Sequence, residues 1–345
     1  MRRLITGGFL LSGAVAIAVT TCAIVLQARG ERAAQRGSEI TGAADGGLEV
    51  LQLRPNFYMI AGAGANIGVQ VGDDGVVVVD AGSTATAGAV AGAIKKITTA
   101  PIRYIINTSA DPDHVGGNET IAKAGQTLLL IRAIGLPNNF LGSGPASILA
   151  AEQVLTRMSA PTGQTSPFPF AAWPTETFNN GRKYMYLNGE GIEILHQTAA
   201  HSDSDSIVFF RRSDVIVAGD IMDTTRFPVI DVARGGSIQG ELDALNRIVE
   251  MAIPSVPIVS REAGTSVIPG HGHVGDQFDV VHYRDMLTII RDHVLDLIKA
   301  GMTLEQIKAA SPAQGYIRRY GSDSGPWTTN DFIEAVYRSL VKAKS

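Results

Sequence analysis

The sequence has little cysteine and no marked excess of either charge. Its single cysteine, Cys22, rules out an intrachain disulfide and a cysteine-rich zinc site, so a metal would have to be bound by histidine and carboxylate groups. The formal net charge is −4, with neither a basic tract nor an acidic tail, which argues against nucleic acid as a partner. The 45% apolar content and the 38 glycines are typical of a globular α/β protein.

Charged residues are also missing from the run Leu4–Ala28, which follows Arg2 and Arg3. The run exceeds the roughly 20 residues that a membrane-spanning helix needs. We therefore expect residues 1–29 to be an N-terminal membrane anchor or signal segment, with the positive start inside. An uncleaved anchor is favoured because Leu26–Ala28 is a mediocre cleavage site. This predicts an exported protein, periplasmic or otherwise extracytoplasmic and anchored to the inner membrane if uncleaved.

The rest of the chain divides into a flexible linker at 30–48 and one folded domain at 49–345, whose C-terminal part from about 280 is helical. The apolar runs Gly75–Val79 and Ile102–Ile106 read as buried strands on either side of an Ala-rich helix at Thr84–Thr98. This order predicts a layered α/β fold with site residues on loops at strand ends.

Other segments are assigned in the same way. Further strands are expected at Phe57–Ile60, Asn66–Val71, Ile192–His196, Ser206–Phe210, Val215–Ala218 and from Ser266 towards His271, and further helices near Val280–Lys299, Thr303–Ala309 and Asp331–Lys342. The stretch Ser147–Met158 is compatible with a helix. Residues 161–174 read as a loop whose aromatic side chains either cover a pocket or pack on the core of the domain.

The segment Asn107–Asn118 contains the densest polar cluster. Asp111, Asp113 and His114 follow the strand at Ile102–Ile106 within a few positions of one another. Crowded carboxylates repel unless a cation neutralises them, and histidine is a common metal ligand. The alternative is an acidic turn in which Asp113 caps a helix.

Similar clusters follow later strands and favour the metal interpretation. His201, Asp220 and His271 each follow an apolar strand. A single histidine in such a place is usually a hydrogen-bonded structural residue. Several strand-end clusters of metal-ligand type are better explained by a shared metal site.

The set Asp113-His114-Val-Gly-Gly117, Ala200-His201, Gly219-Asp220 and Pro269-Gly-His271-Gly resembles the metallo-β-lactamase superfamily in order and spacing. The resemblance extends from about Asn56 to about Gly275. It implies an αββα four-layer sandwich, with extra C-terminal helices here and with metals at one edge of the sheets.

The chain departs from the motif His-x-His-x-Asp-His of that family, because Ser109 and Asp111 replace its first two histidines. The resemblance implies two neighbouring metal sites, here called site one and site two. Site two is complete: its ligands would be Asp113, His114 and His271, with Asp220 as the bridge between the two metals. Site one keeps His201 and the bridge and gains Asp111 as an oxygen ligand, whereas the Ser109 hydroxyl is a poor ligand at neutral pH. We expect one tightly bound Zn²⁺ and a weaker second site, at which iron or manganese competes better than at an all-histidine site.

The resemblance also suggests roles around the metals. Asp113 would orient the attacking water, and Asp80 would steady the metal-binding loop from behind. His273 could replace a missing ligand, although a supporting position is more common for such a neighbour. Arg226 or Arg234 could bind a substrate carboxylate, or could simply be solvated or pair with Asp223 and Asp231.

These features predict an exported metal-dependent hydrolase of a small molecule, in which a metal-bound water attacks an ester, thioester, lactone or lactam. The alternatives are a non-hydrolytic iron-type redox protein and a catalytically reduced binding protein of the same fold.

Overall fold

The computed structural model describes residues 47–127, 144–160, 163–256 and 264–342. The segment 1–29 and all but the last two residues of the linker at 30–48 lie outside these ranges, so the anchor and domain boundaries stay predictions. Within these ranges, no helix has both the length and the apolar character needed to cross a membrane.

The strands of this part of the chain form two sheets. The first has seven strands, in the order β1 (Glu49–Arg54), β2 (Phe57–Ala63), β3 (Ala65–Gly72), β4 (Gly75–Val79), β5 (Ile102–Ile106), β6 (Ser147–Ala151) and β7 (Glu176–Phe178). The second has five, in the order β12 (Ser266–His271), β11 (Val215–Asp223), β10 (Asp205–Phe210), β9 (Glu190–Gln197) and β8 (Arg182–Leu187). Both sheets are mixed: β4 to β7 pair in parallel, as do β11 and β12.

The helices follow the same chain order. They are α2 (Ala87–Ile97), α3 (Pro112–Val115), α4 (Asn118–Ala124), α5 (Glu152–Met158), α6 (Ile238–Met251), α7 (Gln277–Lys299), α8 (Leu304–Ala309), α9 (Ile317–Tyr320) and α10 (Thr329–Lys342), with 3-10 turns at Phe170–Ala172 and Val232–Arg234.

Strand β4 shows how the layers are built, because it is buried on both faces. Val77 and Val79 pack in the cluster between the two sheets, whereas Val76 and Val78 pack with α2 on the outer side. The alternation follows from the two-residue period of a strand. Each fully buried valine contributes about 1.5 kcal/mol or more by leaving water.

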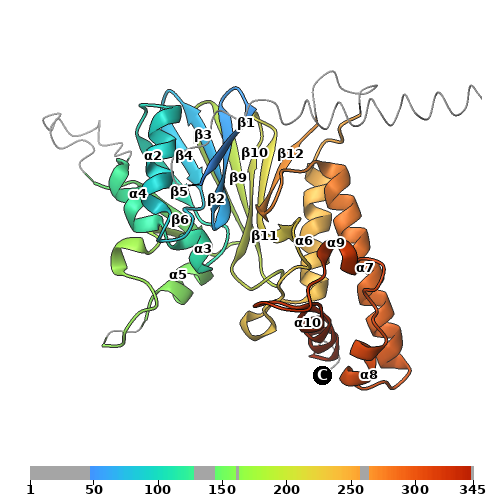
Figure 1. Ribbon diagram of the computed structural model, residues 1–345. Coiled ribbons are helices and arrows are strands. Elements are labelled where there is room, and N and C mark those ends of the chain that lie inside the picture. Colours follow the sequence, from blue (N-terminus) through green and yellow to red (C-terminus); the bar gives the residue numbers. More distant parts are fainter. Residues whose placement is uncertain (1–46, 128–143, 161–162, 257–263, 343–345) are drawn as a thin grey trace, which may run out of the picture. The chain divides into compact units, whose positions relative to one another are not determined.

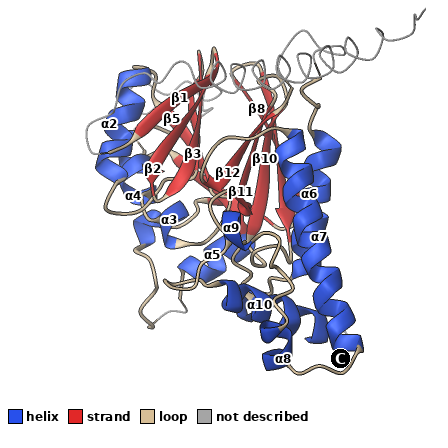
Figure 2. Cartoon of the chain, turned by 45° about the vertical axis from the view of Figure 1, so that its right-hand side comes forward, coloured by secondary structure: helices blue, strands red, loops and turns tan. Residues whose placement is uncertain are grey.

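The outer face of the second sheet packs on α6 and α7, so helices cover both outer faces (Figures 1 and 2). The predicted αββα sandwich with C-terminal helices is confirmed.

The C-terminal helices also support the loop that follows β11. Phe332 of α10 stacks on Phe227 of that loop with ring centroids 4.7 Å apart, and Phe227 donates its backbone N–H to the Tyr320 carbonyl. These contacts hold the segment that carries Arg226 at the edge of the sheet.

Two assignments differ from the sequence patterns. Ser147–Met158 is a strand, β6, followed by the short helix α5, because Ile148 and Leu149 pair with β5 and are buried. Non-local pairing here outweighs the helix propensity of the Leu-Ala-Ala run. The helix expected at Thr84–Thr98 is present but begins at Ala87.

Candidate metal centre

Asp113 and His114 lie on α3, directly after β5. Pro112 starts this short helix, and Asp111 occupies its N-cap position with an extended backbone and no side-chain capping hydrogen bond. Asp113 therefore is not the cap, and neither carboxylate is used to begin the helix. Both are free to face the edge of the sheets.

The predicted ligands of site two converge. Asp113, His114 and His271 each place one ligand atom within 4.8 Å of the others. His271 Nε2 lies 3.3 Å from Asp113 Oδ2 and 3.5 Å from Asp220 Oδ1. His114 Nε2 lies 3.1 Å from the same oxygen of Asp220.

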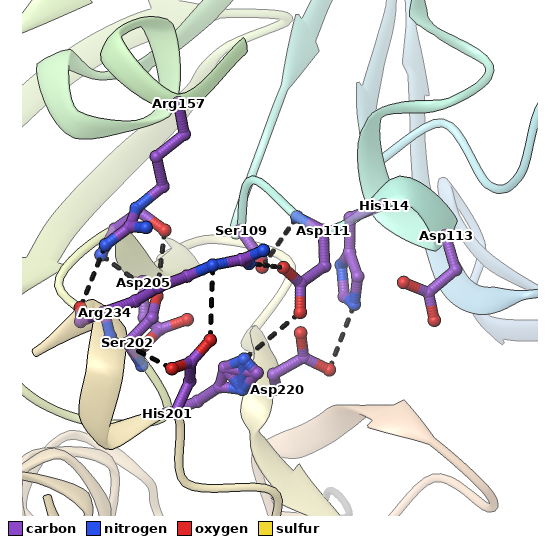
Figure 3. A network of polar contacts seen from close by, with 12 residues as sticks. Ser109, Asp111, Asp113, His114, Arg157, His201, Ser202, Asp205, Asp220 and Arg234 are labelled. Carbon is purple, nitrogen blue, oxygen red and sulfur yellow. Dashed lines mark hydrogen bonds and ion pairs between the residues drawn. The ribbon is translucent and has the colours of Figure 1, made fainter. Parts of the chain in front are cut away.

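The predicted ligands of site one converge as well. Asp111, His201 and Asp220 form a second such group, and His201 Nε2 lies 3.1 Å from Asp111 Oδ2. Asp220 thus faces both groups, as expected for a bridging residue (Figure 3). The structure brings all six predicted metal residues together, and their role as ligands stays a prediction.

Two glycines allow Asp220 to occupy this place within β11. The pairing of β11 with β12 is irregular around Gly219, which has a φ of 56°. A Cβ on Gly270 of β12 would lie 2.9 Å from Asp220 Oδ1. Only glycine leaves room for that carboxylate oxygen beside the neighbouring backbone.

Asp80 supports His114 from behind. His114 Nδ1 is 2.8 Å from Asp80 Oδ2, and Thr108 donates to the two oxygens of Asp80 from its backbone N–H at 2.8 Å and its hydroxyl at 2.6 Å. In the neutral imidazole that a metal requires, a hydrogen bond from Nδ1–H to Asp80 would leave the Nε2 lone pair facing the site. Asp80 therefore lies where the supporting role requires it. Thr108 was not predicted, since its contact depends on the packing of β4 beside β5.

The charges of site two are mutually stabilising. Burial alone would lower the pKa of His114, but the Asp220 and Asp80 carboxylates raise it well above the usual histidine value. Burial raises the pKa of Asp220, but the His114 charge, hydrogen bonds from His114 and His271 and the His201 charge together outweigh burial and leave the pKa well below its usual range. For His271, hydrogen bonds to Asp113 and Asp220 overcome the effect of burial and raise its pKa to about 9.

The surroundings of site one differ. His201 is buried, and neither of its ring nitrogens has a hydrogen-bond partner within the described ranges. The nearby Asp205 is buried and accepts a hydrogen bond from the Ser202 backbone; burial raises the pKa of Asp205 to about 7. The charge of Asp205 contributes to raising the pKa of His201 despite burial. Asp205 was not predicted as part of the site.

Ser109 and His273, which were predicted to lie next to the metal ligands, make hydrogen bonds within their own loops. Ser109 is buried, and its hydroxyl accepts a hydrogen bond from the Asp111 backbone N–H at 3.2 Å. His273 is in neither ligand group, and its Nδ1 lies 3.2 Å from its neighbour's carbonyl.

Both arginines of the loop after β11 make ion pairs. Arg226 Nε lies 2.8 Å from Asp223 Oδ2, and Arg234 Nε lies 3.2 Å from Asp231 Oδ2. These are the pairings that the alternative to substrate binding predicted. Arg234 also donates from Nη1 to Asp111 Oδ1 at 2.8 Å, a contact that the sequence did not predict.

A pocket opens at this edge of the sheets. It is lined by Asp111, Asp113, His201, Asp220, Asp223, Arg226, Val229 and His271. The aromatic residues of the loop at 163–174 do not line it: Phe168 and Trp173 pack on the cluster that contains Val154 and Met158, and Phe170 is 80% exposed. Their position agrees with the core-packing alternative.

The donor set fits a divalent cation. Carboxylate oxygens and imidazole nitrogens converge, and buried nitrogens of His114 and His201 have no aligned hydrogen-bond partner among the described residues. Such buried polar atoms are unfavourable without a partner. Nitrogen and oxygen donors in this mixture are those that bind zinc, iron or manganese.

A family model described as "Metallo-beta-lactamase superfamily" matches residues 61–256. The chain belongs to the metallo-beta-lactamase superfamily. His271 lies beyond the matched segment, so its place at the site is supported by the structure. The comparison with curated proteins found no match.

Several solved structures share the fold. A double mutant of a sec-alkyl sulfatase has a TM-score of 0.59 at 15% identity, with 85% of this chain and 50% of that one covered. The stereoselective inverting sec-alkylsulfatase Pisa1 from Pseudomonas sp. gives 0.56 at 16%, with 84% and 49% covered. A metallo-beta-lactamase from Pontibacter korlensis gives 0.50 at 15%, with 70% and 99% covered. The chain thus spans about half the length of the alkylsulfatases.

Proposed function

We propose that this protein is a metal-dependent hydrolase that cleaves an ester, thioester, lactone or lactam of a small molecule. The observation that carries the proposal is the convergence of Asp113, His114, Asp220 and His271, which come from three distant parts of the sequence. The support of His114 by Asp80 strengthens it, because an oriented imidazole is ready to bind a cation through Nε2.

A divalent cation bound here would lower the pKa of a water molecule towards neutrality and polarise the bond under attack. The protein contributes the orientation. Asp113 is partly exposed to the pocket, so its carboxylate can accept a hydrogen bond from the attacking water. Arg226 lines the same pocket and offers donors to an anionic group of the substrate.

Zinc is the first choice of metal, with iron or manganese as competitors, because the ligands combine imidazoles with several carboxylates. We propose one tightly held ion at site two and a weaker site one. Sulfate esters join the substrate classes to be tested, since two structures of similar fold are sec-alkylsulfatases.

The test combines metal analysis with activity. Protein purified without added metal is analysed for zinc, iron and manganese, then assayed on carboxylic ester, thioester, lactone, lactam and alkyl sulfate substrates. Zinc near one equivalent, with hydrolysis that Asp113→Ala abolishes, supports the proposal. Iron without hydrolysis would favour a redox protein. The absence of bound metal would favour a binding protein that has lost turnover.

We also propose that the protein acts outside the cytoplasm. This rests on the uncharged run Leu4–Ala28. Cell fractionation and mass analysis of the mature N-terminus test it: recovery of the full-length chain in the soluble cytoplasmic fraction would contradict export.

A further inference from the structure

The side chain of Asp111 is shared between two partners of different kind. Its Oδ2 lies 3.1 Å from His201 Nε2, within site one, whereas Oδ1 accepts a hydrogen bond from Arg234 Nη1 at 2.8 Å. A guanidinium thus approaches the carboxylate that would have to bind a second cation (Figure 3).

Arg234 is held in this position by its own segment. Asp231 Oδ1 accepts a hydrogen bond from the Arg234 backbone N–H at 3.0 Å, and its Oδ2 pairs with Arg234 Nε at 3.2 Å. The Arg234 carbonyl accepts from Arg157 Nη2 and from the Asp203 backbone N–H, both at 2.9 Å. Because these contacts already order the Arg234 backbone and the Nε edge of its guanidinium, the contact with Asp111 requires little further loss of conformational freedom.

Arg226 has a different arrangement although it lines the same pocket. It pairs with Asp223, which belongs to neither group of candidate ligands. Arg234 therefore contacts a candidate ligand, Asp111, whereas Arg226 carries the same charge but contacts no candidate ligand through its ion pair.

We propose that Arg234 is a built-in competitor for the second metal ion. This inference rests on the proposed metal centre. The guanidinium neutralises part of the negative charge of Asp111 and occupies Oδ1, so a cation at site one would have to bind a carboxylate that is already paired and would lie near a fixed positive charge. Because a guanidinium stays protonated at every pH of interest, the competition is permanent. Together with Ser109 in place of a histidine, it sets the centre to hold one tightly bound ion.

The experiment is a zinc titration of chelator-treated full-length protein in the wild-type form and in three variants: Arg234→Gln, Arg234→Lys and the matched control Arg226→Gln. Stoichiometry and stepwise affinities are measured by calorimetry against a competing chelator, with the melting temperature as a check of folding.

Arg234→Gln should tighten binding of the second zinc ion about tenfold or more, because it removes the positive charge that contacts Asp111. Arg234→Lys keeps the charge without the planar fork and should fall between Arg234→Gln and wild type. Arg226→Gln should change either affinity by about threefold or less, since Arg226 pairs with Asp223, which belongs to neither ligand group.

An unchanged second equivalent in folded Arg234→Gln would overturn the inference while leaving the first metal, and the proposed function, intact. Equal tightening in Arg226→Gln would also overturn it, by showing a general charge effect. If no variant and no wild-type protein binds zinc, iron or manganese, the proposed function fails and this inference fails with it.

Discussion

The two halves of the centre contain similar ligands in unlike surroundings. In site two, His114 is oriented by Asp80, which Thr108 holds in turn, and the carboxylates of Asp113 and Asp220 face the histidines. In site one, His201 has no hydrogen-bond partner for either ring nitrogen within the described ranges, and Arg234 is bound to Asp111.

Similar residue types are therefore not expected to give the two sites the same metal affinity. Each site offers histidine and carboxylate. In site two, Asp80 orients the His114 ring before a cation binds, whereas His201 of site one has no such hydrogen bond among the described residues. Site one has a competing cation and the buried carboxyl group of Asp205 beside it. Orientation and charge therefore favour binding at site two.

The largest effect is expected from a substitution of Asp220, which faces both sites. Asp220→Asn should abolish tight metal binding at both sites and lower kcat about a thousandfold or more, because the bound ion supplies the nucleophile. Metal analysis and steady-state kinetics measure this. Asp223→Asn is the control: it alters a buried carboxylate of the same strand that lies outside both ligand groups, and it should keep the first metal. Comparable metal loss in both variants would contradict the bridging role.

A direct comparison of the two sites uses one histidine from each. His271→Ala should remove the tightly bound metal and lower kcat about a hundredfold or more, whereas His201→Ala should keep that metal and cost about tenfold. Zinc content and kinetics of the two variants, measured side by side, decide it. Equal losses in both variants would show that the two sites are equivalent and would contradict tighter binding at site two.

The support behind His114 gives a smaller effect. Asp80→Asn should weaken binding of the first zinc ion about 10- to 100-fold, since the imidazole loses its orienting carboxylate. Competitive zinc titration measures this, and Asp205→Asn serves as the matched buried carboxylate near site one. A larger loss of the first zinc ion in Asp205→Asn than in Asp80→Asn would reverse the assignment of the tight site.

The smallest expected effect concerns stability near the centre. Glu241 of α6 is buried, with no hydrogen-bond partner for either oxygen among the described residues; burial, then the charges of Asp205 and Asp220, raise its pKa well above the usual value. Above the unfolded-state pKa, the unfolded chain binds fewer protons at Glu241, so stability falls as pH rises towards the folded-state value.

Glu241→Gln should therefore raise the free energy of unfolding by about 1 kcal/mol at neutral pH, and less at pH 4. Denaturant melts across that range measure it. Glu250→Gln, at an exposed position of the same helix, is the control and should change little. A gain that is the same at both pH values would show that the Glu241 charge is not responsible.

Local sequence patterns predicted many of the strands and helices, and the resemblance implied their arrangement as an αββα sandwich. The runs Gly75–Val79 and Ile102–Ile106 gave strands with the expected bounds, because β-branched residues fill both faces of a buried strand. Residues 147–151 were less clear, since their pairing with β5 is invisible in a local window. The helix α6 was not predicted at all, although Ser237 caps it by accepting from the Gly240 N–H.

The candidate site was predicted from residue types at strand ends and from the resemblance to the metallo-β-lactamase superfamily, and the six predicted metal residues do lie together. What the sequence did not predict are contacts made through tertiary packing. Arg234 meets Asp111 across 123 positions, and Thr108 meets Asp80 across 28. No spacing rule covers such pairs, because the fold alone determines which loops meet at the edge of the sheets.

Anomalous diffraction at the zinc edge, from crystals grown with one equivalent of zinc, tests most directly whether the first ion binds at site two. We predict one strong peak bounded by Asp113, His114, Asp220 and His271, with little or no density between Asp111 and His201. A peak centred on site one, or no peak at this edge of the sheets, would contradict this prediction.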